Sequence, residues 1–161
     1  MLSYFMLQIK TKVKKKFLVP LVVFLILLIG YAFYKDFNGN SKEICVENKT
    51  CFSIEVADSL DERKIGLSDK NSIEENEGML FIFQQEEIPG FWMKDMGFPI
   101  DIVWIDKNMK ITGIEKSLEP CEEGKECPVF YPSRNKMYVL EISSGLSDKY
   151  GFEEGDSVYL R

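Results

Sequence analysis

The chain has 161 residues, a formal net charge of −6 and no histidine. The missing histidine removes the usual general base and the commonest metal ligand, and it excludes a Ser-His-Asp triad. Residues 1–34 carry five lysines and no acid, whereas residues 37–161 carry 14 basic and 25 acidic side chains. Because nucleic-acid binding needs basic surface, this acidic part argues against a nucleic-acid partner.

The N-terminal part of the chain predicts a membrane anchor. Residues 17–34 form an apolar run without charge, which as a helix would span roughly 27 Å, about one hydrocarbon core. The lysines of the basic segment 1–16 place the N-terminus in the cytoplasm by the positive-inside rule. A cleaved signal peptide, cut near residues 30–32, is the alternative. We expect residues 35–49 to hold a linker and the start of the outer domain, and residues 50–161 to form an extracytoplasmic domain of a single-pass membrane protein.

The outer domain shows short apolar runs separated by turn residues, a pattern typical of β-strands. Ser59 and Glu62 form a capping box, which predicts a short helix over residues 60–66 with Leu60 and Leu67 facing the core. Residues 144–150 predict a second short helix. The predicted fold is mainly β, a compact sandwich or partial barrel with two short helices. The predicted strands are 50–57, 79–83, 91–94, 100–106, 109–115, 137–143 and 157–160.

The four cysteines form two local pairs with five residues inside each pair. Outside the cytosol an even number of cysteines indicates disulfides, and of the three possible pairings we favour Cys45–Cys51 with Cys121–Cys127. A four-cysteine zinc site is the rival interpretation, but zinc ribbons place about two to four residues between paired cysteines. We therefore expect no metal and no cofactor. Asn48 begins an N-glycosylation sequon on the outer side of the membrane.

Strand alternation singles out two acids. Asp101 and Glu141 each lie among aliphatic residues on one face of a predicted strand. A carboxylate on an apolar face needs a partner because burying it alone is costly, and Lys94 is the nearest cation in the motif. We therefore predict a cluster of Lys94, Asp101 and Glu141 lined by Trp92, which is a buried ion pair, a set of strand-end charges in water, or a ligand-binding pocket.

These residues lie in blocks that resemble an uncharacterised prokaryotic family, catalogued as domain of unknown function 192. The resemblance implies a compact, mainly β, jelly-roll-like fold in an exported or membrane-tethered protein, with no established activity. The family usually has Asn-Thr where this chain has Asp95-Met96, and often Met where it has Ser68. The similarity covers about residues 50–160, and its blocks are 62–67, 78–81, 91–94, 99–102, 138–141 and 155–156.

The leading functional hypothesis is a membrane-tethered extracytoplasmic binding or interaction module. Its site would be the groove around Trp92, Lys94, Asp101 and Glu141, and its ligand a glycan, a peptide or an envelope protein. An enzyme that acts on glycans or envelope components is the first alternative, with Asp101 and Glu141 as acid and base about 5–9 Å apart across an open cleft. A structural envelope protein without a concave site is the second alternative, and the oligomeric state is not defined by the sequence.

Overall fold

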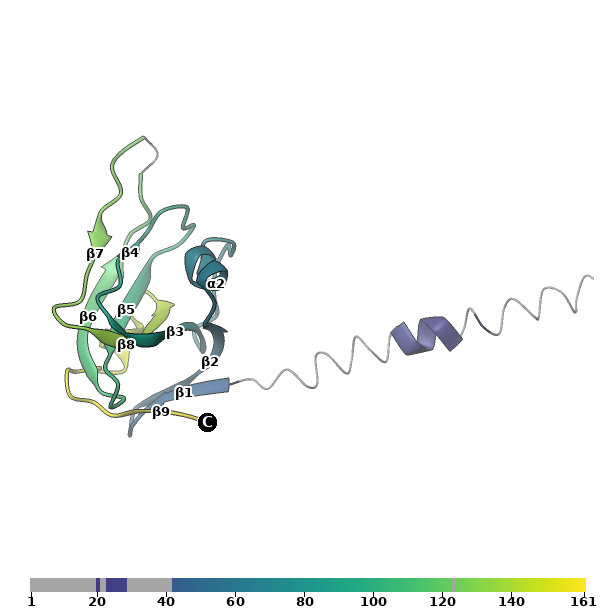
Figure 1. Cartoon of the computed structure of the whole chain (residues 1–161), viewed down its shortest axis with the longest axis horizontal. Coiled ribbons are helices and arrows are strands. Elements are labelled where there is room, and N and C mark those ends of the chain that lie inside the picture. The colour runs from purple at the N-terminus through teal and green to yellow at the C-terminus, as the bar shows by residue number, and fades with distance from the viewer. Residues whose placement is uncertain (1–19, 21–22, 29–41, 123) are drawn as a thin grey trace, which may run out of the picture. The chain divides into compact units, whose positions relative to one another are not determined.

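The computed structural model describes residue 20 and residues 23–28, 42–122 and 124–161 (Figure 1). The chain divides into two compact units, Met1–Asn40 and Ser41–Arg161. Residues 20 and 23–28 of the predicted anchor 17–34 are helical and exposed, and the rest of that segment, like segment 1–16 and residues 35–41, lies outside the described residues. No helix among the described residues has both the length and the apolar character that a membrane crossing needs.

The second unit is a mainly β domain whose principal sheet curls into a half-barrel (Figure 1). The seven strands run in the order β6-β5-β8-β3-β2-β1-β9; β2 and β3 pair in parallel and the other neighbours pair antiparallel. The strands are β1 (Lys42–Val46), β2 (Thr50–Ala57), β3 (Glu77–Glu87), β5 (Ile100–Ile105), β6 (Ile111–Leu118), β8 (Lys136–Ser143) and β9 (Val158–Leu160). A two-stranded ribbon joins β4 (Phe91–Trp92) to β7 (Val129–Phe130).

The two outermost strands of the sheet approach each other, which explains the curl. The N–H of Val158 donates to the carbonyl of Met109 over 2.8 Å, and the N–H of Ile111 donates to the carbonyl of Asp156 over 3.0 Å. The first bond connects the start of β9 with the segment before β6, and the second connects the segment before β9 with the start of β6. Of the two predicted architectures, the partial barrel is therefore the one observed.

Both faces of the sheet are buried, so the domain has two apolar cores. All six residues of β5 are buried, with Ile100, Ile102 and Trp104 on one face and Val103 and Ile105 on the other, as the alternation predicts. The first core draws side chains from all seven strands and lies inside the curl: Ile44, Val46, Phe52, Ile54, Leu80, Val103, Ile105, Ile111, Leu140, Ile142, Leu146, Phe152 and Val158. The second core lies on the outer face: Ala57, Leu67, Met79, Phe81, Phe83, Met93, Ile100, Ile102, Trp104 and Val139.

Helix α2 (Leu60–Ile65) begins where its capping box predicts. The hydroxyl of Ser59 accepts the N–H of Glu62 over 3.2 Å, and the carboxylate of Glu62 accepts the N–H of Ser59 over 2.9 Å. The helix buries none of its own residues. The prediction for Leu67 is confirmed because this side chain is buried, but the prediction for Leu60 is wrong because this side chain is 79% exposed. The second predicted helix is observed as α3 (Leu146–Lys149).

Three features of the strands were not predicted. Strand β1 lies within segment 35–49 and forms by pairing with β2 and β9, although its charged start resembles the preceding linker. Strand β3 continues through the polar residues 84–87, where a break was expected, because β8 pairs with it again at Glu87. Strand β7 lies between the predicted strands 109–115 and 137–143, where no strand was expected, and forms by pairing with β4. In each case the partner strand decides the structure.

The predicted disulfide pairing is confirmed. Cys45–Cys51 joins two residues that face each other in the β1–β2 hairpin, with a Cα–Cα distance of 4.0 Å. Cys121–Cys127 closes the loop between β6 and β7, with a Cα–Cα distance of 5.5 Å. All four cysteines are in these bonds, so they form no zinc site. Asn48 lies exposed in the hairpin turn between β1 and β2.

Candidate functional site

A cavity of about 280 Å³ opens on the outer face of the sheet, between α2 and the segment that contains β4. Two buried phenylalanines of β3 and one carboxyl of β8 line it from the sheet side, and exposed residues of α2 and β4 line its mouth. We call this space the α2–β4 cavity. Its lining residues are Arg63, Lys64, Ile65, Gly66, Leu67, Ser68, Phe81, Phe83, Pro89, Gly90, Phe91, Trp92, Lys94, Asp95, Met96 and Glu141.

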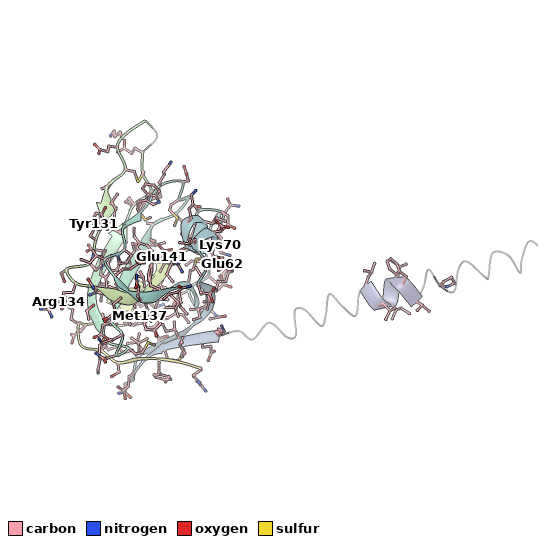
Figure 2. All side chains as sticks on the ribbon, in the orientation of Figure 1. Glu62, Lys70, Tyr131, Arg134, Met137 and Glu141 are labelled. Carbon is pink, nitrogen blue, oxygen red and sulfur yellow. A yellow bond between two sulfur atoms is a disulfide. The ribbon has the colours of Figure 1, made fainter. Side chains whose placement is uncertain are left out.

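Glu141 supplies the carboxyl at the bottom of the cavity. It lies on β8 between two apolar neighbours, Met79 of β3 and Ile102 of β5, and Figure 2 shows it well inside the outline of the domain. Its side chain is 5% exposed, and its buried Oε2 has no hydrogen-bond partner among the described residues. Burial raises the pKa of Glu141 to about 8, so this carboxyl is mostly protonated at neutral pH. A protonated carboxyl both donates and accepts hydrogen bonds.

Asp101 lies on the opposite face of the same sheet. The register pairs Asp101 with Ile142 and Ile102 with Glu141, and paired residues point to the same face. Because successive residues alternate between faces, the two acids are separated by the sheet. The structure therefore brings Trp92, Lys94 and Glu141 to one cavity and leaves Asp101 outside it. Asp101 and Glu141 therefore do not face each other across an open cleft, the arrangement on which the enzyme hypothesis depends.

The carboxylate of Asp101 is fully buried and fully hydrogen-bonded. Its Oδ1 accepts the N–H groups of Ser117 over 2.8 Å and of Gly145 over 3.1 Å. Its Oδ2 accepts the N–H of Ser147 over 3.0 Å and the hydroxyl of the same serine over 2.6 Å. These four donated hydrogen bonds satisfy both oxygens of Asp101 without a cation. They also join β5 to the end of β6 and to the start of α3. This arrangement gives Asp101 a structural role.

The mouth of the cavity is basic, although the domain as a whole is acidic. The guanidinium carbon of Arg63 lies 5.2 Å from the ring centroid of Phe83, and its Nη1 donates to the carbonyl of Ile82 over 2.9 Å. The Nζ of Lys94 lies 5.6 Å from the ring centroid of Trp92, which is 53% exposed. Lys64 is exposed beside them. Within the described part of the chain, none of these three cations takes part in an ion pair.

Two glycines allow close packing at the sheet beside the cavity: Gly66 faces the aromatic wall of the cavity, whereas Gly78 lies on the opposite face, toward the inner core. A Cβ atom at Gly78 of β3 would lie 2.7 Å from the backbone oxygen of Glu141 on the neighbouring strand β8. Only glycine therefore fits at this position of β3. Gly66 ends α2 with a φ of +54°, and a Cβ atom there would lie 3.3 Å from the ring of Phe81. The turn at Gly66 thus brings the end of α2 onto the aromatic wall.

Sequence reasoning did not find Arg63, Lys64, Phe81 and Phe83 as site residues. Arg63 and Lys64 lie in block 62–67 of the family resemblance, and Phe81 lies in block 78–81. Membership in these blocks was the one signal in the sequence that could have pointed to them. What was missing was the position of α2 over β3, which depends on packing between segments far apart in the chain.

These features define the protein as a small mainly β domain with a defined cavity whose floor carries an unpartnered carboxyl. Residues 43–160, well over half of the chain, match the family DUF192, described as an uncharacterized ACR, and the chain belongs to this family. This confirms the resemblance drawn from the sequence blocks. No functionally curated protein matches the chain significantly.

Two solved structures are similar to this chain. A protein of unknown function from Novosphingobium aromaticivorans shares 25% identity with a TM-score of 0.67, and the match covers 73% of this chain and 83% of that chain. A protein from Sinorhizobium meliloti, described as a candidate transcription regulator, shares 23% identity with a TM-score of 0.65, over 73% of this chain and 90% of that chain. The second similarity concerns the fold alone.

Proposed function

We propose that this protein is a membrane-tethered extracytoplasmic binding module and that its ligand occupies the α2–β4 cavity. The observation that carries the proposal is the buried, unpartnered Oε2 of Glu141, which lines a cavity of about 280 Å³. An unpartnered buried polar atom costs about 1–3 kcal/mol, and a ligand atom that hydrogen-bonds to it removes this cost. A concave site with an apolar, partly aromatic wall and a small number of placed polar groups is the usual form of a small-molecule site, and this cavity has that form.

The tether and the compartment are supported by separate observations. The uncharged run 17–34 follows a lysine cluster, which is the pattern of an anchor whose C-terminal side lies outside. Both disulfides lie in the domain that follows, and disulfides persist in oxidising compartments. Asn48 is exposed in a turn, where the fold leaves room for a glycan.

The binding proposal can be tested with the two tryptophans of the chain. Trp92 lines the mouth of the cavity and Trp104 is buried in the second core without lining the cavity, so 5-fluorotryptophan labelling gives one ¹⁹F signal from the site and one internal reference signal from the core. We expect a fragment library to contain molecules that shift the Trp92 signal of the full-length protein in non-ionic detergent.

A variant then establishes that these fragments occupy the cavity. Glu141→Leu removes the floor carboxyl and should abolish the shifts, whereas the matched control Glu154→Gln changes an exposed acid of the C-terminal segment and should leave them unchanged. A library without any fragment that moves Trp92, or shifts that survive in Glu141→Leu, would refute the cavity as the binding site.

A further inference from the structure

The charge distribution of the α2–β4 cavity indicates the chemical class of its ligand, an inference that rests on the proposed function. We propose that the ligand is a small organic anion of about one ring in size. Its uncharged end, which carries a carbonyl or hydroxyl group, would bind the carboxyl of Glu141, and its anionic group would remain at the mouth with Arg63, Lys64 and Lys94.

The floor of the cavity selects for an uncharged polar group. Glu141 is surrounded in the sheet by Met79 and Ile102, and the neighbouring wall consists of Phe81 and Phe83. Nothing in this wall can compensate a net charge. Since burial keeps the carboxyl mostly protonated at neutral pH, it offers a proton to a carbonyl or hydroxyl oxygen. A ligand amine would take the proton of Glu141 and leave two charges inside this apolar wall, and burying these charges is costly.

The mouth selects for negative charge. Three cations line it against one acid, Asp95, and the domain elsewhere has an excess of acidic side chains. An acidic domain repels anions in general, so cations that gather at one opening attract an anion to that opening alone. Neither Lys64 nor Lys94 is neutralised by an ion pair among the described residues, which leaves both available.

The size of the cavity limits the ligand to one ring. A volume of about 280 Å³ lies just below the usual range of ligand pockets, roughly 300–1,000 Å³. The part of the ligand inside the cavity is therefore comparable to a monosaccharide or a substituted benzene. The half-exposed indole of Trp92 provides a flat surface at the entrance on which such a ring can pack.

Two matched sets of probes test the inference with the full-length protein. The sugar set is N-acetylglucosamine 6-phosphate, N-acetylglucosamine and glucosamine; the benzene set is 4-acetamidobenzoate, acetanilide and benzylamine. We expect the anionic member of at least one set to bind about tenfold more tightly than its neutral member, because each partly exposed charge contact adds a modest gain. The cationic members should bind most weakly. The dissociation constants come from the ¹⁹F shift of Trp92.

Two further measurements locate the charge effect. Lys64→Gln should weaken binding of the anionic probe about threefold and leave the neutral probe unchanged, whereas Lys42→Gln, the same change on an exposed lysine of β1, should alter neither. Raising the pH from 6 to 9 should weaken binding of 4-acetamidobenzoate, whose own charge is constant over this range, because Glu141 loses its proton and the ionised carboxylate repels the anion.

The outcomes separate the two proposals. Neutral members that bind as tightly as anionic ones, or tighter binding of the cationic members, would overturn the anion inference and leave the cavity as the binding site. If no member of either set shifts Trp92 at 10 mM, the anion inference is overturned, while the fragment library decides separately on the proposed function. Equal losses in Lys64→Gln and Lys42→Gln would overturn the assignment of the mouth as the charge-selective element.

Discussion

Replacing Glu141 with glutamine should make the protein more stable at neutral pH, and the gain should grow with pH. Glutamine has nearly the shape of the protonated glutamate and never ionises. The pKa of Glu141 rises from an ordinary value of 4.5 to about 8 because burial disfavours the charged form. Between these two values the unfolded chain has lost the proton and the folded chain still holds it.

The magnitude follows from proton linkage. Where the folded state binds one proton more than the unfolded state, the free energy of unfolding falls by about 1.4 kcal/mol per pH unit. Wild type should therefore lose about 3 kcal/mol from this group between pH 4.5 and pH 7 and about 4 kcal/mol by pH 8, above which the loss levels off. The variant has no such loss, so its stability relative to wild type should increase by these amounts across the window.

Urea unfolding of the full-length chain in non-ionic detergent, followed by tryptophan fluorescence with the disulfides intact, measures the difference. It should be recorded at each pH unit from 5 to 9. Three other carboxyls have lowered pKa values in the folded protein, so their contribution to stability is complete above their ordinary pKa and is lost only as the pH falls below this window. Both proteins contain them, so they do not affect the difference. They are Glu62, Glu75 and Asp156. The exposed control Glu154→Gln should follow wild type. Parallel stability curves for wild type and Glu141→Gln between pH 5 and 8 would refute the assignment of Glu141 as a buried, uncompensated carboxyl.

Three further predictions concern the framework around the site. Asp101→Asn should cost about 2–4 kcal/mol of stability, because the amide presents a donor to the donors of Ser147; a near-neutral result in the same urea assay would argue against its structural role. Gly78→Ala should cost about 2 kcal/mol or more because its Cβ meets a backbone oxygen, whereas Gly97→Ala, with 3.8 Å to its nearest neighbour, should be nearly neutral; similar melting curves for the two variants would contradict this difference. Protease added to intact cells should digest the β domain, and mass spectrometry should find four thiols only after reduction; a protected domain with free thiols would contradict both the tether and the compartment.

Local signals were sufficient for part of the fold. Strand β2 has the bounds that its alternation predicts, and the capping box of Ser59 and Glu62 begins α2 where expected. The two disulfides were predicted because each closes a short loop, so both partners lie in one stretch of chain. Strand β7 was not predicted because its partner β4 lies elsewhere in the sequence, and β1, whose charged start resembles a linker, is completed by the distant strand β9 as well as by its neighbour β2.

The candidate site shows where this local information ends. Alternation within β5 and within β8 placed Asp101 and Glu141 each on one face of its own strand, and both assignments hold. Whether the two faces coincide depends on the register between the strands, and a shift by a single residue reverses the answer. The sequence alone determined which residues belong together on a strand. Only the tertiary structure decided that Asp101 turns toward the inner core and that Glu141 turns toward the cavity under Arg63 and Lys64, because register and the placement of α2 arise from contacts between distant segments.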